Sequence, residues 1–212
     1  MSFSFPSPFY AMADTLNRPA LSFQRLTQQL CAGGVRLLQL RVKQQPTRDF
    51  VSLATAVRRI CHDSQCTLII NDRVDVALAV ESDGVHLGQE DLPLTAARKV
   101  VGGEKIIGVS THTAQQALTA EQEGADYIGF GPLFGTTTKA TGYTARGLEQ
   151  LQEVRQQVHI PIVAIGGITA ERAPAVLQAG ADAVALISDI VLAPDIQHRV
   201  KTLLRQLDSP KG

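Results

Sequence analysis

The sequence predicts an α/β fold, namely a single (β/α)8 TIM barrel, on the strength of three observations. Hydrophobic residues make up 44% of the 212-residue chain and charged residues 19%, so a sizeable core can be buried. Aromatic residues make up only 5% and Trp is absent. A core of Ala, Val, Ile and Leu is typical of a parallel sheet covered by helices. Short apolar runs also alternate with helical patterns along the whole chain.

Each short apolar run predicts a strand. The expected strands are 9–13, 35–42, 67–71, 84–88, 105–110, 126–131, 161–166 and 183–188. Segments with apolar spacing near 3.6 predict the helices, and Thr169 is the expected N-cap of one of them. The expected helices are 21–33, 48–62, 73–80, 94–101, 113–123, 147–157, 170–179 and 189–206.

Three junctions resemble one another, each with a small turn containing an Asp before a strand. They read SDGVHLG (82–88), GADYIGFG (124–131) and GADAVALIS (180–188). A solenoid would need a stricter repeat than this. Strict alternation of β and α favours a closed barrel, with a doubly wound open sheet as the alternative. No linker divides the chain, so we expect one domain over 1–212, with 1–8 as a loose N-terminal extension.

Composition excludes several classes of function. Lys plus Arg equals Asp plus Glu at 20 each, which argues against nucleic-acid or anionic-membrane binding because both need a basic field. No signal peptide or membrane span is expected. The three cysteines have no CxxC spacing and are interpreted as core thiols of a protein in the reducing cytoplasm.

Polar residues gather where the expected strands end, which in a barrel is where the site lies. Gln39, Arg41 and Lys43 alternate, so a period of two places them on one face. The ends of the next strands contribute further polar residues. These are Asn71, Asp72, Gln89, Glu90, Asp91, Ser110 and Thr111.

Two of these residues suggest a metal. Asp72 and Asp91 follow neighbouring strands, and Mg²⁺ takes one or two carboxylates while water and substrate phosphate complete its shell. The alternative for each is a helix N-cap, which is a common role for an Asp after a strand. For Arg41 and Lys43 the alternative is a plain network of ion pairs within the barrel.

A second anion site is expected after the last two strands. Gly166, Gly167 and Ser188 stand where barrels often bind phosphate through backbone N–H groups, although a Gly pair is also common in a tight turn. The long loop 131–147 lies between the two sites and carries Thr136, Thr138 and Lys139. Its glycines and few apolar residues favour a mobile lid.

Other reactive side chains have simpler interpretations. His86 lies inside GVHLG and is interpreted as a core histidine or one that supports the site, while His112 is the only other histidine near the expected mouth. Lys139 could form a Schiff base, but that chemistry needs a desolvated lysine, and this one stands among threonines on a polar loop.

These residues resemble the thiamine-phosphate synthase family. The matching stretches are LQLRVK (38–43), IINDRVDVALAVESDGVHLGQEDLP (69–93), IIGVSTHT (106–113), GADYIGFGPLFGTTTK (124–139), VAIGGI (163–168) and GADAVALIS (180–188). The resemblance implies a (β/α)8 barrel that joins a hydroxymethylpyrimidine diphosphate to a thiazole phosphate. The products are thiamine phosphate and diphosphate, and Mg²⁺ assists a dissociative substitution.

The resemblance also implies a role for each site residue. The pyrimidine diphosphate would be bound by Gln39, Arg41, Lys43, Asn71, Ser110 and Lys139, of which Arg41, Lys43, Ser110 and Lys139 would be catalytic. The thiazole phosphate would be bound by Thr136, Thr138, Gly167, Ile187 and Ser188. Asp72 and Asp91 would hold one Mg²⁺. A homo-oligomer is compatible with the family.

The chain departs from the family pattern at two points. Gly135 stands where proline is common, which should loosen the lid, and Ala13 stands where a Thr is usual, which leaves the roles of Tyr10 and Asp14 open. Two other functions are weighed. A related thiazole tautomerase usually lacks the Thr-x-Thr-Lys loop and the metal aspartates, both present here. A non-catalytic phosphate-sensing barrel would have no use for a leaving-group site.

Overall fold

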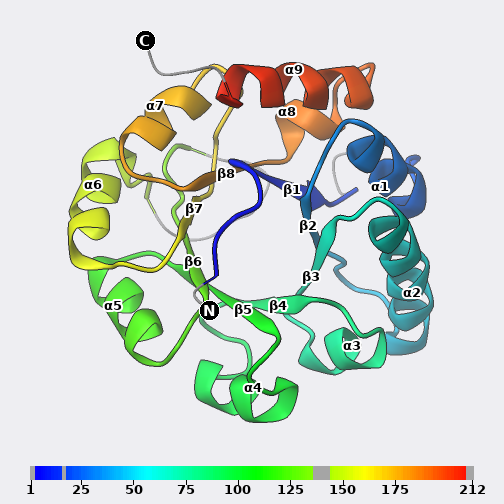
Figure 1. The fold of residues 1–212 in the computed structure, drawn as a ribbon, viewed down its shortest axis with the longest axis horizontal. Helices are drawn as coiled ribbons and strands as arrows, with labels where there is room; N and C mark the ends of the chain where they lie inside the picture. The colour runs from blue at the N-terminus through cyan, green and yellow to red at the C-terminus, as the bar shows by residue number, and fades with distance from the viewer. Residues whose placement is uncertain (1–2, 16–17, 136–143, 209–212) are drawn as a thin grey trace.

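A computed structural model describes residues 3–15, 18–135 and 144–208. Eight parallel strands form a closed barrel in chain order, with β8 paired to β1, and helices surround it (Figure 1). This confirms the predicted (β/α)8 barrel. The strands are β1 Phe9–Ala13, β2 Leu37–Leu40, β3 Thr67–Asn71, β4 Gly84–Leu87, β5 Ile106–Thr111, β6 Tyr127–Phe130, β7 Ile162–Ala164 and β8 Ala183–Leu186.

One helix or more follows each strand in the described chain, and two follow β8. They are α1 Phe23–Ala32, α2 Thr47–Asp63, α3 Val74–Ala79, α4 Leu94–Val101, α5 Ala114–Gln122, α6 Gly147–Gln157, α7 Ala173–Gln178, α8 Ser188–Val191 and α9 Ile196–Asp208. Ser22 and Thr113 cap α1 and α5, and their hydroxyls accept the N–H groups of Arg25 and Gln116. Caps of this kind satisfy donors that a helix leaves free.

Some element boundaries differ from the prediction. Thr169 is not the N-cap of α7, because its carbonyl accepts the N–H groups of Arg172 at 3.1 Å and Ala173 at 3.0 Å and so forms a turn ahead of the helix. The second strand stops at Leu40, so Arg41 and Lys43 follow it rather than lying on its face. Ser188 begins α8 instead of ending β8.

The resemblance between the three junctions has a structural cause. The Asp of each junction accepts the backbone N–H of a residue in the preceding strand: Asp83 from Leu68, Asp126 from Ile107 and Asp182 from Ile162, at 2.7–2.8 Å. An arginine from the helix ahead of that strand pairs with each carboxylate. These ion pairs are Arg58–Asp83, Arg98–Asp126 and Arg155–Asp182. The repeated Asp therefore ties strands together at the amino end of the barrel.

The interior of the barrel is filled by inward-facing side chains. Tyr10 and Tyr127 are fully buried there with Leu37, Ile69 and Val163. Gly108 on the neighbouring strand β5 makes room for the Tyr127 ring, since a Cβ at this position would lie 2.1 Å from Cζ of Tyr127. A larger apolar cluster occupies the layer between the strands and the helices. The centre is thus a packed core, as in other barrels of this class.

The first described residues close the amino end of this core. The Phe5 ring lies 5.3 Å from the Tyr127 ring and 6.1 Å from the Tyr10 ring, and Phe3 lies 5.5 Å from Tyr127. Figure 1 shows this segment crossing the middle of the barrel before β1 begins. Phe3 and Phe5 therefore pack against the barrel, whereas Ser4 and Pro6 between and after them are exposed. The first two residues of the expected extension 1–8 lie outside the described residues.

Candidate active site

A cavity of about 370 Å³ opens at the carboxyl ends of the strands. Its wall includes side chains or backbone from seven of the residues to which the resemblance assigned substrate binding. They are Gln39, Arg41, Asn71, Ser110, Gly167, Ile187 and Ser188. Parallel strands all end on this side of the barrel, so residues up to about 150 positions apart in the chain converge here.

A continuous chain of hydrogen bonds forms the floor of the cavity. Gln39 Nε2 donates to the Tyr10 hydroxyl at 3.0 Å, which lies 2.7 Å from the Tyr127 hydroxyl. Nδ1 of His86 lies 3.0 Å from the Tyr127 hydroxyl and its Nε2 lies 2.8 Å from Ser110 Oγ. Burial raises the pKa of both tyrosines, so they stay neutral near pH 7. The network fixes the orientation of Gln39 and Ser110.

Arg41 is held by a buried carboxylate. It forms an ion pair with Asp14, whose side chain is 2% exposed while that of Arg41 is 11% exposed. The Arg41 N–H also donates to the Ala13 carbonyl at 3.0 Å, which extends the pairing of β1 with β2 by one residue. The guanidinium thus enters the cavity wall in one fixed orientation.

Lys43, Asp72 and Asp91 form a separate group that does not line this cavity. Lys43 pairs with Asp72, which directly follows the cavity residue Asn71 and has a φ of 65°. Asp91 Oδ2 accepts the Gly88 N–H at 2.7 Å, and its carboxyl group lies near enough to Asp72 to affect the pKa of that residue. The structure therefore brings these three residues together next to the cavity.

The two carboxyl groups differ in acidity. Burial tends to raise the pKa of Asp72, but hydrogen bonds from Lys43 and Asp91 outweigh it and hold that pKa below its ordinary value. Burial raises the pKa of Asp91; the Gly88 hydrogen bond opposes the rise and the Asp72 carboxylate adds to it. The Asp91 carboxyl group thus favours the charged form of Asp72, while Asp72 favours the neutral form of Asp91, as expected for two carboxyl groups that share a site.

This donor set fits Mg²⁺. Asp72 and Asp91 follow the neighbouring strands β3 and β4, and each affects the pKa of the other, so the two carboxyl groups lie near each other. Mg²⁺ commonly takes one or two carboxylates and completes its shell with water and phosphate oxygens. The helix-cap alternative is not what the structure shows. The N-cap residues of α3 and α4 are Arg73 and Pro93.

The glycines after β7 allow two loops to come into close contact. Gly166 and Gly167 have φ angles of 88° and 66°, which favour glycine. A Cβ on Gly167 would lie 2.5 Å from the Gly135 carbonyl oxygen. Thr169 lines the same end of the cavity, and its Oγ1 is buried without a hydrogen-bond partner among the described residues. A ligand with several acceptor oxygens would satisfy it.

The loop after β6 is anchored at both described ends. The Leu133 N–H donates to the Ile165 carbonyl at 2.9 Å, and the Gly147 N–H donates to the Leu133 carbonyl at 2.9 Å. The Leu133 side chain is fully buried, although the sequence suggested few apolar anchors for this loop. Thr136, Thr138 and Lys139, the predicted phosphate and diphosphate contacts, lie outside the described residues.

Sequence reasoning left three supporting residues without a specific role. Tyr10 and Tyr127 build the floor of the cavity, and Asp14 holds Arg41 in its wall. Alternation along β6 could have indicated that Tyr127 faces inward. No local sequence pattern could have indicated the role of Asp14, because its partner Arg41 follows a different strand.

Two further side chains line the cavity without a role assigned from the sequence. The Arg172 guanidinium stacks 4.6 Å from the centre of the Phe134 ring, which belongs to the loop after β6. His112 is buried in the wall, with Nδ1 2.6 Å from the Gly131 carbonyl oxygen. Both residues therefore contact the segment that follows β6.

The fold and the site define a class: a (β/α)8-barrel protein with a polar, arginine-containing cavity at the carboxyl ends of its strands. A family model described as thiamine monophosphate synthase matches residues 9–190. The thiamine-phosphate synthase of Moorella thermoacetica is 45% identical over 92% of this chain and 91% of its own. That of Methanospirillum hungatei is 43% identical over 88% of this chain and 91% of its own.

A solved structure agrees with these relatives. The thiamine phosphate pyrophosphorylase of Pyrococcus furiosus superposes with a TM-score of 0.87 at 35% identity, over 96% of each chain. The chain belongs to the thiamine-phosphate synthase family, as the resemblance predicted, and it is accordingly an enzyme of the transferase class. In the part of the chain that the structure describes, no helix has the length and apolar character needed to cross a bilayer.

Proposed function

We propose that this enzyme transfers a pyrimidinylmethyl group from 4-amino-2-methyl-5-(diphosphooxymethyl)pyrimidine to 4-methyl-5-(2-phosphooxyethyl)thiazole or its carboxylated form. The products are thiamine phosphate and diphosphate. One observation carries the proposal. A single cavity joins Gln39, Arg41, Asn71 and Ser110 on one side to Gly167, Ile187 and Ser188 on the other. Two phosphorylated substrates could therefore lie side by side in it.

The leaving group belongs on the side of Arg41. Its guanidinium offers a fixed fork of donors that matches diphosphate oxygens, and Lys43 adds a second positive charge beside Asp72. Ser110 and Gln39 are oriented by the hydrogen-bonded floor and would position the pyrimidine end of the same substrate. Lys139 would add a third cation. Preorganised donors of this kind stabilise charge that develops as a bond breaks.

Asp72 and Asp91 would hold one Mg²⁺ next to this diphosphate subsite. When bound, such an ion neutralises charge on phosphate oxygens and so makes diphosphate a better leaving group. Lys43, which pairs with Asp72, would turn toward the diphosphate oxygens as the carboxylate takes up the ion. We expect the three residues to act as a unit for this reason.

The second substrate, the thiazole phosphate, would bind on the side of the cavity opposite Arg41. Gly167, Ile187 and Ser188, with Thr136 and Thr138, would hold the thiazole phosphate. The Thr169 hydroxyl, which has no partner among the described residues, supports a phosphate at this end of the cavity. The attacking thiazole nitrogen carries no proton, so the reaction needs no general base from the protein. His86 fits this view, because both of its ring nitrogens face hydroxyl groups of the floor.

The test is direct. The enzyme is incubated with both substrates and Mg²⁺, and the formation of thiamine phosphate and diphosphate is followed. We expect Asp72→Ala and Asp91→Ala to lower turnover at least about 100-fold and to weaken its dependence on Mg²⁺. Asp75→Ala is the matched control, since Asp75 follows closely but is 59% exposed and forms an ion pair only with Arg73 among the described residues. Full turnover by the two variants without Mg²⁺ would contradict the metal assignment.

Three further expectations concern the location, the partners and the oligomeric state of the protein. Cys31, Cys61 and Cys66 form no disulfide, which is typical of a protein in the reducing cytoplasm, and we propose that location. The partners would be the two small substrates, with neither nucleic acid nor membrane involved. A homo-oligomer is compatible with this arrangement and would be measured by light scattering.

A further inference from the structure

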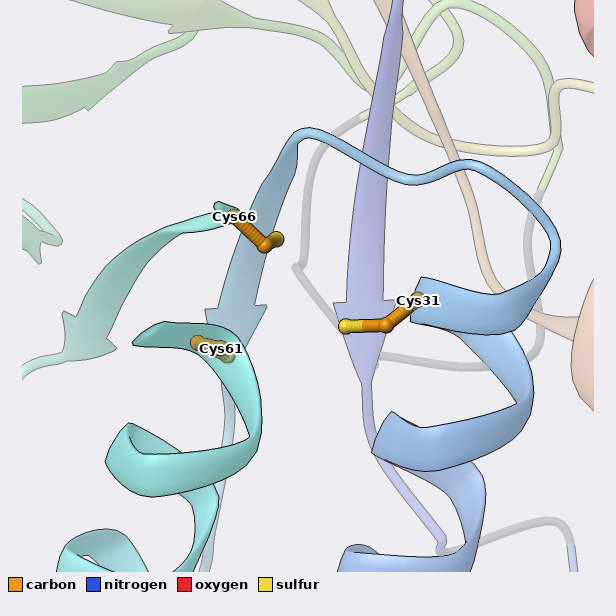
Figure 2. Close-up of side chains that lie close together, drawn as sticks. All are labelled: Cys31, Cys61 and Cys66. Atoms are coloured by element: carbon orange, nitrogen blue, oxygen red, sulfur yellow. The ribbon is translucent and has the colours of Figure 1, made fainter. Parts of the chain in front are cut away.

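The three cysteines of the chain come together at one point, although two lie on different helices and the third lies just before a strand. Cys31 is in the last turn of α1, Cys61 is near the end of α2, and Cys66 immediately precedes β3. All three Sγ atoms lie within 4.8 Å of one another. Figure 2 shows the side chains directed into the same gap between the two helix ends and the strand.

This thiol cluster lies away from the cavity. Cys66 precedes the first residue of β3, and Asn71, which lines the cavity, is the last residue of that strand. The cluster is therefore at the amino end of the barrel and the cavity at the carboxyl end. The reaction proposed above makes no use of the three sulfurs.

The cluster is buried and its backbone is held in place. Cys31, Cys61 and Cys66 are 8%, 0% and 3% exposed. The Cys66 N–H donates to the Cys61 carbonyl at 2.8 Å, and the Cys31 carbonyl accepts the Gly34 N–H at 2.9 Å.

We propose that Cys31, Cys61 and Cys66 form a binding site for one soft, closed-shell metal ion, and that Cu(I) is the ion it fits best. A metal–sulfur bond of about 2.3 Å places three sulfurs of a trigonal site about 4 Å apart. The sulfurs already lie within 4.8 Å, so each pair would approach by less than about 1 Å. Each thiol that ligates the ion releases its proton, and no oxidant is needed.

The donor set favours Cu(I) over other metals. Thiolates select soft ions, whereas structural Zn²⁺ is almost always held by four protein ligands. Among the described residues, this is the only group of three or more His, Cys, Asp or Glu side chains able to share an ion, and it contains sulfur alone. A disulfide would join only two of the three sulfurs and would need an oxidant to form.

The experiment titrates the reduced full-length enzyme with Cu(I) under anaerobic conditions, against a chromogenic chelator that competes for the ion. Because the chain has three cysteines in all, any thiolate-to-metal charge-transfer band reports this cluster. We expect one Cu(I) per chain, release of protons, and a higher unfolding temperature for the loaded protein. Zn²⁺ and Cd²⁺, titrated in the same way, should bind more weakly.

Single substitutions test whether all three sulfurs take part. Cys31→Ser, Cys61→Ser and Cys66→Ser should each weaken Cu(I) binding at least about 100-fold. Ser52→Ala is the matched control, because Ser52 lies on the same helix as Cys61 but is exposed and bonds the Arg48 carbonyl of its own helix. One cysteine variant with unchanged affinity would overturn the three-sulfur site. Tighter binding of Zn²⁺ than of Cu(I) would overturn the choice of metal.

Two further measurements keep the proposal falsifiable if a variant fails to fold. The X-ray absorption spectrum of the unsubstituted loaded protein should give three sulfur neighbours around copper, and two would contradict the site. The folded protein should also bind Cu(I) more tightly than the protein in denaturant. Equal affinities would mean that the fold does not create the site.

Discussion

Arg41 illustrates how a single side chain depends on a partner that is distant in sequence. Its charge stands at the cavity wall, and Asp14 holds it from the neighbouring strand end while remaining almost fully buried. A buried ion pair of this kind adds little net stability, but removing one partner leaves an uncompensated charge. Asp14 therefore acts on the reaction through Arg41.

We predict that Asp14→Asn raises the KM for the pyrimidine diphosphate about 10- to 100-fold, because the guanidinium loses its fixed position. The KM for the thiazole phosphate should change much less, since its subsite lies opposite. Steady-state kinetics with each substrate varied in turn would measure both. Asp63→Asn is the control, as Asp63 is 81% exposed. Equal changes in both KM values would indicate general damage to the fold.

The tyrosine pair gives a second prediction at this scale. Tyr127→Phe removes the hydroxyl that joins Tyr10 to His86, and it leaves two buried polar groups short of a partner. The free energy of unfolding should fall by about 1–3 kcal/mol. Tyr10→Phe should cost a similar amount, and the double variant less than the sum, because both act on one hydrogen bond. Urea unfolding of the three variants would check this, and strict additivity would contradict it.

The sequence was most informative about residues at strand ends. Gln39, Asn71 and Ser110 could be placed near a site because parallel strands bring their carboxyl ends to one edge, whatever the loops do. Tyr10 and Asp14 could not be paired with their partners, because a contact between strands leaves no local pattern. The roles assigned to the site residues stay predictions.

At the scale of elements, the repeated junctions contribute to the stability of the barrel rather than to catalysis. Asp83, Asp126 and Asp182 each bind the backbone of the preceding strand and an arginine at the amino end of the barrel. The sequence showed the repetition but not its cause. The predicted helix start at Thr169 differs from the observed one, because a turn and the first turn of a helix share the same polar residues.

A glycine in β5 gives the prediction for this scale. In Gly108→Ala the new methyl group would overlap the Tyr127 ring, which the floor network and its neighbours hold in place. We expect a loss of about 1–3 kcal/mol in the free energy of unfolding. Gly103→Ala is the matched control, since nothing lies within 4 Å of a Cβ there. Equal stabilities of the two variants, measured in urea, would refute the packing explanation.

At the scale of the whole molecule, the alternation of apolar runs and helices predicted the barrel correctly. The order of elements was sufficient, because eight parallel strands with helical connections close most simply in chain order. The packing of Phe3 and Phe5 against the barrel was not predicted. Their short FSF motif gives no periodic signal, and its place is set by an opening that exists only once the barrel has closed.

We predict that Phe5→Ala lowers the free energy of unfolding by about 1–2 kcal/mol, because the half-buried ring covers Tyr10 and Tyr127. Activity at a temperature well below unfolding should be unchanged, as the ring lies at the end away from the cavity. Ser4→Ala, at an exposed neighbouring position, is the control. Thermal unfolding and an activity assay would separate the two effects. A loss of activity without a loss of stability would contradict this picture.

The arginine–aspartate ties described for the fold have a consequence for how this enzyme can change. They sit at one end of the barrel, and the cavity sits at the other. Loops around the cavity can therefore be exchanged or lengthened without breaking the ion pairs that hold the strands in register. Directed evolution toward altered substrates should find tolerated sequence diversity concentrated on one rim, while the opposite rim stays nearly invariant.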